Sequence, residues 1–66
     1  MNITLNGKQR QIDRGSVLDL IGHLALDART VVVELNGSVV QRSDFESVRL
    51  SEGDNVEVVR FVGGGE

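Results

Sequence analysis

The chain has 66 residues, enough for one small domain with a modest core and little room for an enclosed active-site pocket. It has no cysteine and a single histidine, His23, which excludes disulfides and thiolate metal sites and argues against a histidine-rich zinc site, so we expect no bound metal. The net charge of −3 argues against a nucleic-acid partner. No segment approaches the roughly 20 apolar residues that span a bilayer, and the N-terminus is unlike a signal peptide. We therefore predict a cytoplasmic protein without a nucleic-acid or membrane partner.

The N-terminal segment predicts a β-hairpin. Apolar and polar residues alternate over residues 1–5, and the Asn6-Gly7 pair that follows is preferred in two-residue hairpin turns because both positions need a positive φ. The returning strand, residues 8–12, is mostly polar. It is therefore expected at a partly exposed edge of the sheet.

A short amphipathic helix is predicted after this hairpin. Ser16 is a good N-cap, and Asp19 stands three residues later, as in a capping box. Gly22 interrupts the helical pattern at a cost of up to about 1 kcal/mol relative to alanine, so the helix is expected to be short. Its core face consists of apolar residues at helical spacing: Val17, Leu20, Ile21 and Leu24.

A second hairpin is predicted in the next segment. A β-branched run over residues 31–35 indicates a central strand, and the turn pair Asn36-Gly37 leads into an antiparallel strand over residues 38–41. Phe45 follows in a short helical turn, where we expect it to plug the core.

The last strand, residues 55–61, has two different faces. Val56 and Val58 lie on one face, whereas Val59 and Phe61 lie on the other. The order hairpin, helix, hairpin, strand suits a mixed sheet of four or five strands packed on one helix, with the first and last strands parallel in its centre. We therefore predict an α+β fold of the sheet-on-helix type.

The C-terminus is the most informative part of the sequence. The last strand runs into three consecutive glycines at positions 63–65, followed by Glu66, so we expect a domain over residues 1–62 and a flexible tail over residues 63–66. Such a tail can be a merely frayed chain end. It can also be a thread, because residues without a Cβ fit a narrow channel and can present a terminal carboxylate to the active site of another protein. No phosphate-binding loop accompanies these glycines, so a partner would have to hold ATP.

The whole chain resembles the ThiS family, the sulfur carriers of thiamine biosynthesis, which have the ubiquitin-like β-grasp fold. The order and spacing of the matching segments, and their distance from the C-terminus, are specific as a set. The segments that carry the resemblance are residues 1–7, 16–24, 33–37, 39–40, 50–54 and 56–64.

The resemblance implies a carrier that is not itself an enzyme and that binds no cofactor. An E1-like adenylyltransferase would use ATP and magnesium to adenylate the terminal glycine. Sulfur derived from cysteine through a desulfurase would then replace the adenylate to give a thiocarboxylate, and thiazole synthase would take this sulfur for the thiazole ring. In this chain the modified residue would be Gly65, with Gly63 and Gly64 as the tail.

Glu66 departs from the family pattern, which ends in a bare Gly-Gly carboxylate. Three explanations are open. A tail-trimming protease removes Glu66 and exposes Gly65, as happens in precursors of ubiquitin-like proteins; or Glu66 is an artefact of expression or engineering; or the carrier role has been lost. We favour removal by a protease.

Partner docking is predicted on the open face of the sheet, beside the tail. Val59, Phe61 and Val62, joined by Val32 from the neighbouring strand, would form an apolar docking surface. The competing interpretation is that the last strand twists and that Phe61 belongs to the core. An acidic domain of this kind favours a partner with a basic docking site.

Other functions fit the same fold. They are sulfur transfer to molybdopterin or another sulfur-containing product, attachment to lysines as a ubiquitin-like modifier through Gly65, and a plain interaction module. The shortness of the chain favours the thiamine carrier, because molybdopterin-type carriers are usually longer.

Overall fold

A computed structural model describes residues 1–61 of the chain, and the predictions for Val62, Gly63, Gly64, Gly65 and Glu66 lie outside these residues. The described part folds into five strands, one α-helix and two single-turn 3₁₀-helices. In chain order they are β1 (Asn2–Leu5), β2 (Lys8–Gln11), α1 (Val17–His23), η1 (Ala28–Thr30), β3 (Val31–Leu35), β4 (Ser38–Val40), η2 (Arg42–Asp44) and β5 (Asn55–Arg60).

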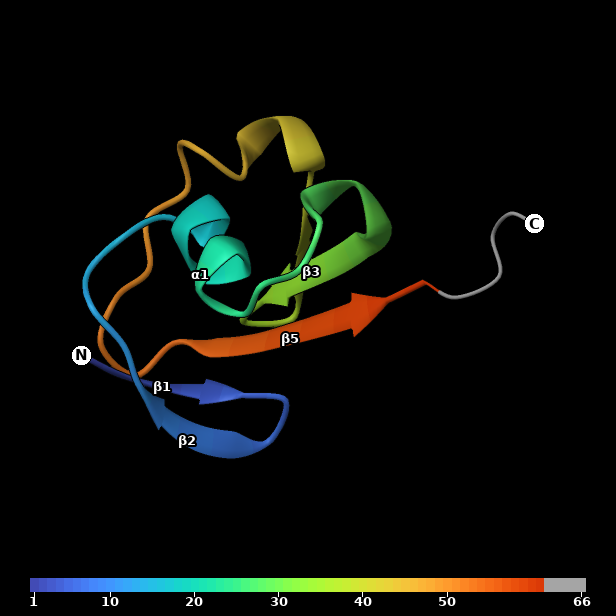
Figure 1. Ribbon diagram of the computed structural model, residues 1–66. Coiled ribbons are helices and arrows are strands. Elements are labelled where there is room, and N and C mark those ends of the chain that lie inside the picture. Colours follow the sequence, from blue (N-terminus) through green and yellow to red (C-terminus); the bar gives the residue numbers. More distant parts are fainter. Residues whose placement is uncertain (62–66) are drawn as a thin grey trace.

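The strands form one mixed sheet in the order β2-β1-β5-β3-β4 (Figure 1). β1 and β5 are parallel neighbours in the middle of the sheet, and every other neighbouring pair is antiparallel. Helix α1 lies across one face of the sheet, and the other face is left open (Figure 1). This arrangement confirms the predicted α+β sheet on one helix, with five strands rather than four.

Both hairpin turns have the backbone that their Asn-Gly pairs predict. The φ angles are 50° and 82° at Asn6-Gly7, and 51° and 88° at Asn36-Gly37. Positive φ at both central residues gives a turn whose twist matches that of the flanking strands. The two turns therefore set the registers of the strand pairs β1–β2 and β3–β4.

The helix begins at the predicted cap. The Ser16 side chain accepts a hydrogen bond from the Asp19 backbone at 3.1 Å, and the Asp19 carboxylate accepts one from the Ser16 backbone at 2.9 Å. The helix ends in a Schellman motif, in which the Leu26 N–H donates to Ile21 and the Ala25 N–H donates to Gly22. Ala25 takes the left-handed position of this motif, with φ 59°.

The core lies between α1 and the covered face of the sheet. The connection from β4 to β5 runs around the helix and contributes Phe45, which is 2% exposed and plugs the core as predicted (Figure 1). Leu18, in contrast, is 40% exposed because it lies on the helix face turned away from the sheet. The buried apolar residues are Ile3, Leu5, Val17, Leu20, Ile21, Val31, Val33, Phe45, Leu50, Val56 and Val58.

Candidate docking face and tail-bearing strand

β5 is the strand from which the chain continues into the glycine tail, and its side chains alternate as the sequence predicts. Val56 and Val58 are buried under α1, whereas Val59 and Phe61 on the opposite face are 58% and 55% exposed. Phe61 is therefore not a core residue, and the competing interpretation of this position is wrong. Val32 lies directly opposite Val59 in the β3–β5 register and is half-buried on the same face.

A further exposed side chain extends this apolar surface. Val39 on β4 is 58% exposed and pairs with Glu34, which lies two residues from Val32 and so shares its face. Val39 was not among the predicted docking residues, although the turn at Asn36-Gly37 fixes the register that places it there. We call Val32, Val39, Val59 and Phe61 the open-face patch.

Two carboxylates lie on the open face beside this patch. Glu34 and Glu57 are exposed and directly opposite each other in the β3–β5 register. Like charges at opposed positions of an antiparallel pair repel and reduce the stability of the sheet. The open face is therefore apolar and acidic, which suits a partner surface that is apolar and basic.

Hydrogen bonds hold β5 on both sides, as far as Phe61 on the β3 side and as far as Val58 on the β1 side. On the β3 side the ladder continues past the strand end, where the Phe61 N–H donates to the Thr30 carbonyl at 2.8 Å. On the other side β1 ends at Leu5, and the side chain of Asn6 takes over from the backbone. Its Oδ1 accepts from the Val58 N–H at 2.8 Å, and its Nδ2 donates to the Val58 carbonyl at 3.2 Å. The Asn6 side chain thus extends the pairing of β1 with β5, a role that the Asn-Gly turn pattern does not predict.

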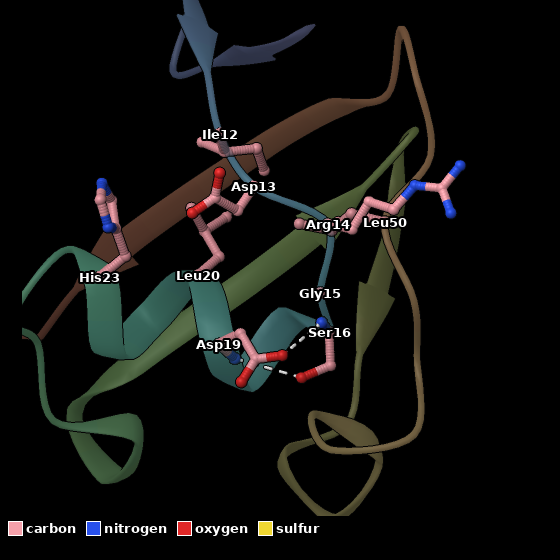
Figure 2. A pocket seen from close by; sticks show the side chains of 9 residues that line it. All are labelled: Ile12, Asp13, Arg14, Gly15, Ser16, Asp19, Leu20, His23 and Leu50. Carbon is pink, nitrogen blue, oxygen red and sulfur yellow. Dashed lines mark hydrogen bonds between the residues drawn. The ribbon is translucent and has the colours of Figure 1, made fainter. Parts of the chain in front are cut away.

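The pocket in Figure 2 collects the titratable residues that come closest to a catalytic arrangement. This cavity of about 160 Å³ lies between the β2–α1 loop and the helix, and Asp13, Asp19 and His23 are among its lining residues. Asp19 is committed to the helix cap, and its hydrogen bonds with the Ser16 backbone and side chain lower the pKa of its carboxyl. His23 stands at the far end of the pocket from Asp19 and is exposed (Figure 2).

Within residues 1–61, no hydrogen bond joins His23 to either carboxylate, and no group of three His, Asp or Glu side chains is placed to bind a metal ion. In the same part of the chain, no helix is long and apolar enough to cross a membrane. Residues 1–61 thus present an exposed apolar patch on the open face, and they bring together no nucleophile–base pair.

Known proteins resemble this chain in both sequence and fold. The family model of the ThiS family matches residues 3–65. The chain is 35% identical to the sulfur carrier protein ThiS of Bacillus subtilis, over 96% of this chain and 98% of that protein. A solved structure of the thiamine biosynthesis protein ThiS from Geobacter metallireducens superimposes with a TM-score of 0.85 at 40% identity, covering 98% of this chain and all of the other.

Two longer relatives are thiazole synthases. The chain is 36% identical to the thiazole synthase of Paramagnetospirillum magneticum and 40% identical to that of Magnetococcus marinus. It spans only about a fifth of their length, namely 20% and 21%. The match to the family model and the full-length likeness to the Bacillus protein confirm the resemblance seen in the sequence: this chain belongs to the ThiS family.

Proposed function

We propose that the chain carries sulfur for thiazole formation in thiamine biosynthesis, as a thiocarboxylate on Gly65. The observation that carries this proposal is the match over nearly the full length of both chains to a relative named as a sulfur carrier protein. The two thiazole synthases that contain a segment similar to this chain support thiazole synthase as the partner that takes the sulfur. They favour this client over molybdopterin synthesis or protein modification.

The chemistry requires activation, because a carboxylate is a poor electrophile at neutral pH. An E1-like adenylyltransferase would hold ATP and magnesium, and an oxygen of the Gly65 carboxylate would attack the α-phosphorus with loss of pyrophosphate. A persulfide formed from cysteine by a desulfurase would then attack the acyl carbon with loss of AMP. A thiol would cleave the resulting acyl disulfide, which releases the thiocarboxylate and leaves the two remaining sulfurs joined as a disulfide. In this cycle the chain would act as a cosubstrate and not as an enzyme, as the match to a relative named as a sulfur carrier protein supports.

The open-face patch is the surface on which we place the activating partner. Phe61 lies where the chain leaves the sheet, and Val62 would continue the apolar surface. Residues 62–65 can span at most about 14 Å when fully extended. A partner docked on the patch must therefore hold its nucleotide within that distance of Phe61. Glu34 and Glu57 would meet basic groups of the same partner.

The reaction also requires that Gly65 end in a free carboxylate. We propose that a protease removes Glu66 first and that the whole cycle takes place in the cytoplasm. The side chain of Glu66 would obstruct a channel built for glycine, and its own carboxylate would lie in the wrong place for transfer to Gly65.

Intact mass measurement tests this proposal. The chain ending at Gly65 is incubated with an E1-like adenylyltransferase, ATP, magnesium and a cysteine-derived sulfur donor, and we expect the mass gain of one sulfur replacing one oxygen. The matched sample that retains Glu66 is expected to stay unmodified. Equal modification of both forms would contradict the role of Gly65.

The docking surface is tested by removing single apolar side chains. Val59→Ser or Phe61→Ser should raise the KM for the carrier in adenylation about tenfold with little change in kcat, because these side chains act in binding. Leu18→Ser is the matched control, since Leu18 is also exposed but lies on α1. An equal rise in KM for the control would show that the open-face patch has no special role.

A further inference from the structure

The face of the sheet that carries α1 has a second candidate surface, at the end of β5 where the tail begins. A groove of about 410 Å³ lies there between the β1–β2 hairpin, the end of β5 and the segment after α1. Leu24, Leu26 and Val58 line its apolar part, and Lys8, Arg10 and Arg60 supply charge. Among residues 1–61, no acidic residue lines this groove.

The strand registers place all three cations on the helix side of the sheet. Lys8 pairs with Leu5, and Arg10 pairs with Ile3, and both apolar partners are buried under α1. Arg60 pairs with Val31, which is also buried. Since directly opposed residues share a face, the three cations project toward the same side as the core, beyond the end of the helix.

This concentration of positive charge is unusual for the chain. Three of its seven lysine and arginine residues line the groove, although the net charge is −3. Among residues 1–61, the salt bridge is between Arg29 and Asp27, on the segment after α1, and none involves a cation of the groove. Lys8, Arg10 and Arg60 are all exposed in this part of the chain.

A purely structural explanation covers only part of this pattern. Charged residues on an edge strand discourage pairing with another chain, which accounts for Lys8 and Arg10 on β2. It does not account for Arg60, because β5 is the central strand and its preceding residues on this face, Val56 and Val58, are buried in the core. The sheet face thus changes from apolar to cationic at the end from which the tail extends.

We propose that this groove binds an acidic, extended segment of a partner protein, distinct from the surface that meets the open face. Its carboxylates would lie between Lys8 and Arg10 on one side and Arg60 on the other, and an apolar side chain would rest on Leu24 and Leu26. A second copy of this chain that faced this groove with its own groove would bring the same cations and be repelled. The leucines and the lack of aromatic lining residues favour a polypeptide over a nucleic acid, whose bases would need stacking partners.

Such a contact would hold the end of β5 from the face opposite the open-face patch. One partner, or two partners together, could then contact both faces of the strand that carries the tail. The inference is independent of sulfur loading, because it concerns binding to the folded domain alone.

The test uses the isotope-labelled chain and a synthetic peptide of alternating Asp, Glu and Leu, with a second peptide in which lysine replaces every acid. We expect the acidic peptide to shift the backbone amide signals of Lys8, Arg10, Leu24, Leu26 and Arg60, and the lysine peptide to leave them unchanged. The double variant Lys8→Glu with Arg10→Glu should bind the acidic peptide roughly tenfold more weakly.

The matched control is Arg42→Glu with Arg49→Glu, which changes the net charge equally at exposed sites outside the groove. Thermal unfolding of each variant checks that it is folded. Four results would overturn the proposal: no shift at millimolar peptide, shifts confined to the open face, equal weakening by the control, or tighter binding of a short single-stranded oligonucleotide than of the acidic peptide.

Discussion

The side chain of Asn6 gives the sharpest test of how the tail-bearing strand is held. Asn6→Gly keeps a residue that tolerates the φ of 50° but removes both hydrogen bonds to Val58, at 2.8 and 3.2 Å. Val58 is only 8% exposed, so water replaces these partners poorly. At about 0.5–1.5 kcal/mol for each bond, the free energy of unfolding should fall by about 2 kcal/mol. In a domain of this size, that loss lowers Tm by roughly 8–16 °C.

Asn36→Gly is the matched control for this substitution. Asn36 occupies the same place in the other Asn-Gly turn, with φ 51°, and it also makes two side-chain bonds, at 2.9 Å to the Asn55 N–H and 3.0 Å to Asp54. These bonds are exposed, so water can replace them, and we expect a loss below about 1 kcal/mol. Urea and thermal unfolding followed by far-UV circular dichroism suit a chain without Trp or Tyr. Equal losses for the two variants would refute the special role of Asn6.

Three further predictions concern the helix end, the open face and the response to acid. Ala25→Gly should raise the free energy of unfolding by about 0.5–1 kcal/mol, because alanine is strained in the left-handed position that ends α1; a loss of stability in urea unfolding would contradict this. Glu57→Lys should raise the free energy of unfolding by about 0.2–1 kcal/mol, because the substitution turns the repulsion with Glu34 into attraction. The same substitution should slow association with the adenylyltransferase, and an unchanged association rate would argue against an acidic docking face. The side-chain and backbone hydrogen bonds from Arg29 lower the pKa of Asp27 from 3.8 to about 2. The stabilisation from the Asp27–Arg29 pair is therefore fully present above pH 3.8 and is lost as the pH falls from 3.8 toward about 2. Asp27→Asn should reduce the loss of unfolding free energy over this pH range. An acid-unfolding profile identical to that of the unsubstituted chain would contradict this.

Local chemistry made most of the fold predictable. The two Asn-Gly pairs fix both hairpins because few other dipeptides accept positive φ at two successive positions. Ser16 and Asp19 mark the helix start through a reciprocal cap that depends only on their spacing. The alternation in the last strand separates the buried valines from Val59 and Phe61, since side chains of a strand alternate between faces.

The features that the sequence did not reveal depend on contacts between distant segments. Asn6 looks like a turn residue, and its bonds to Val58 exist only because β5 returns beside β1, 52 residues later in the chain. The groove could not be predicted for the same reason, because Lys8, Arg10 and Arg60 come to line one groove only through the pairing of β1 with β2 and of β3 with β5. Val39 was overlooked because a three-residue strand carries too little alternation to assign its faces without the register.

Whether Gly65 carries the sulfur is tested most directly on the protein isolated from its native cells. Trypsin cleaves after Arg60, so the trimmed protein releases its tail as a peptide of residues 61–65. We predict that mass spectrometry finds this peptide without Glu66 and with one sulfur in place of one oxygen at Gly65. A tail peptide that keeps Glu66 in the thiocarboxylated protein, or an exchange of oxygen for sulfur found only elsewhere in the chain, would contradict the proposed carrier role of Gly65.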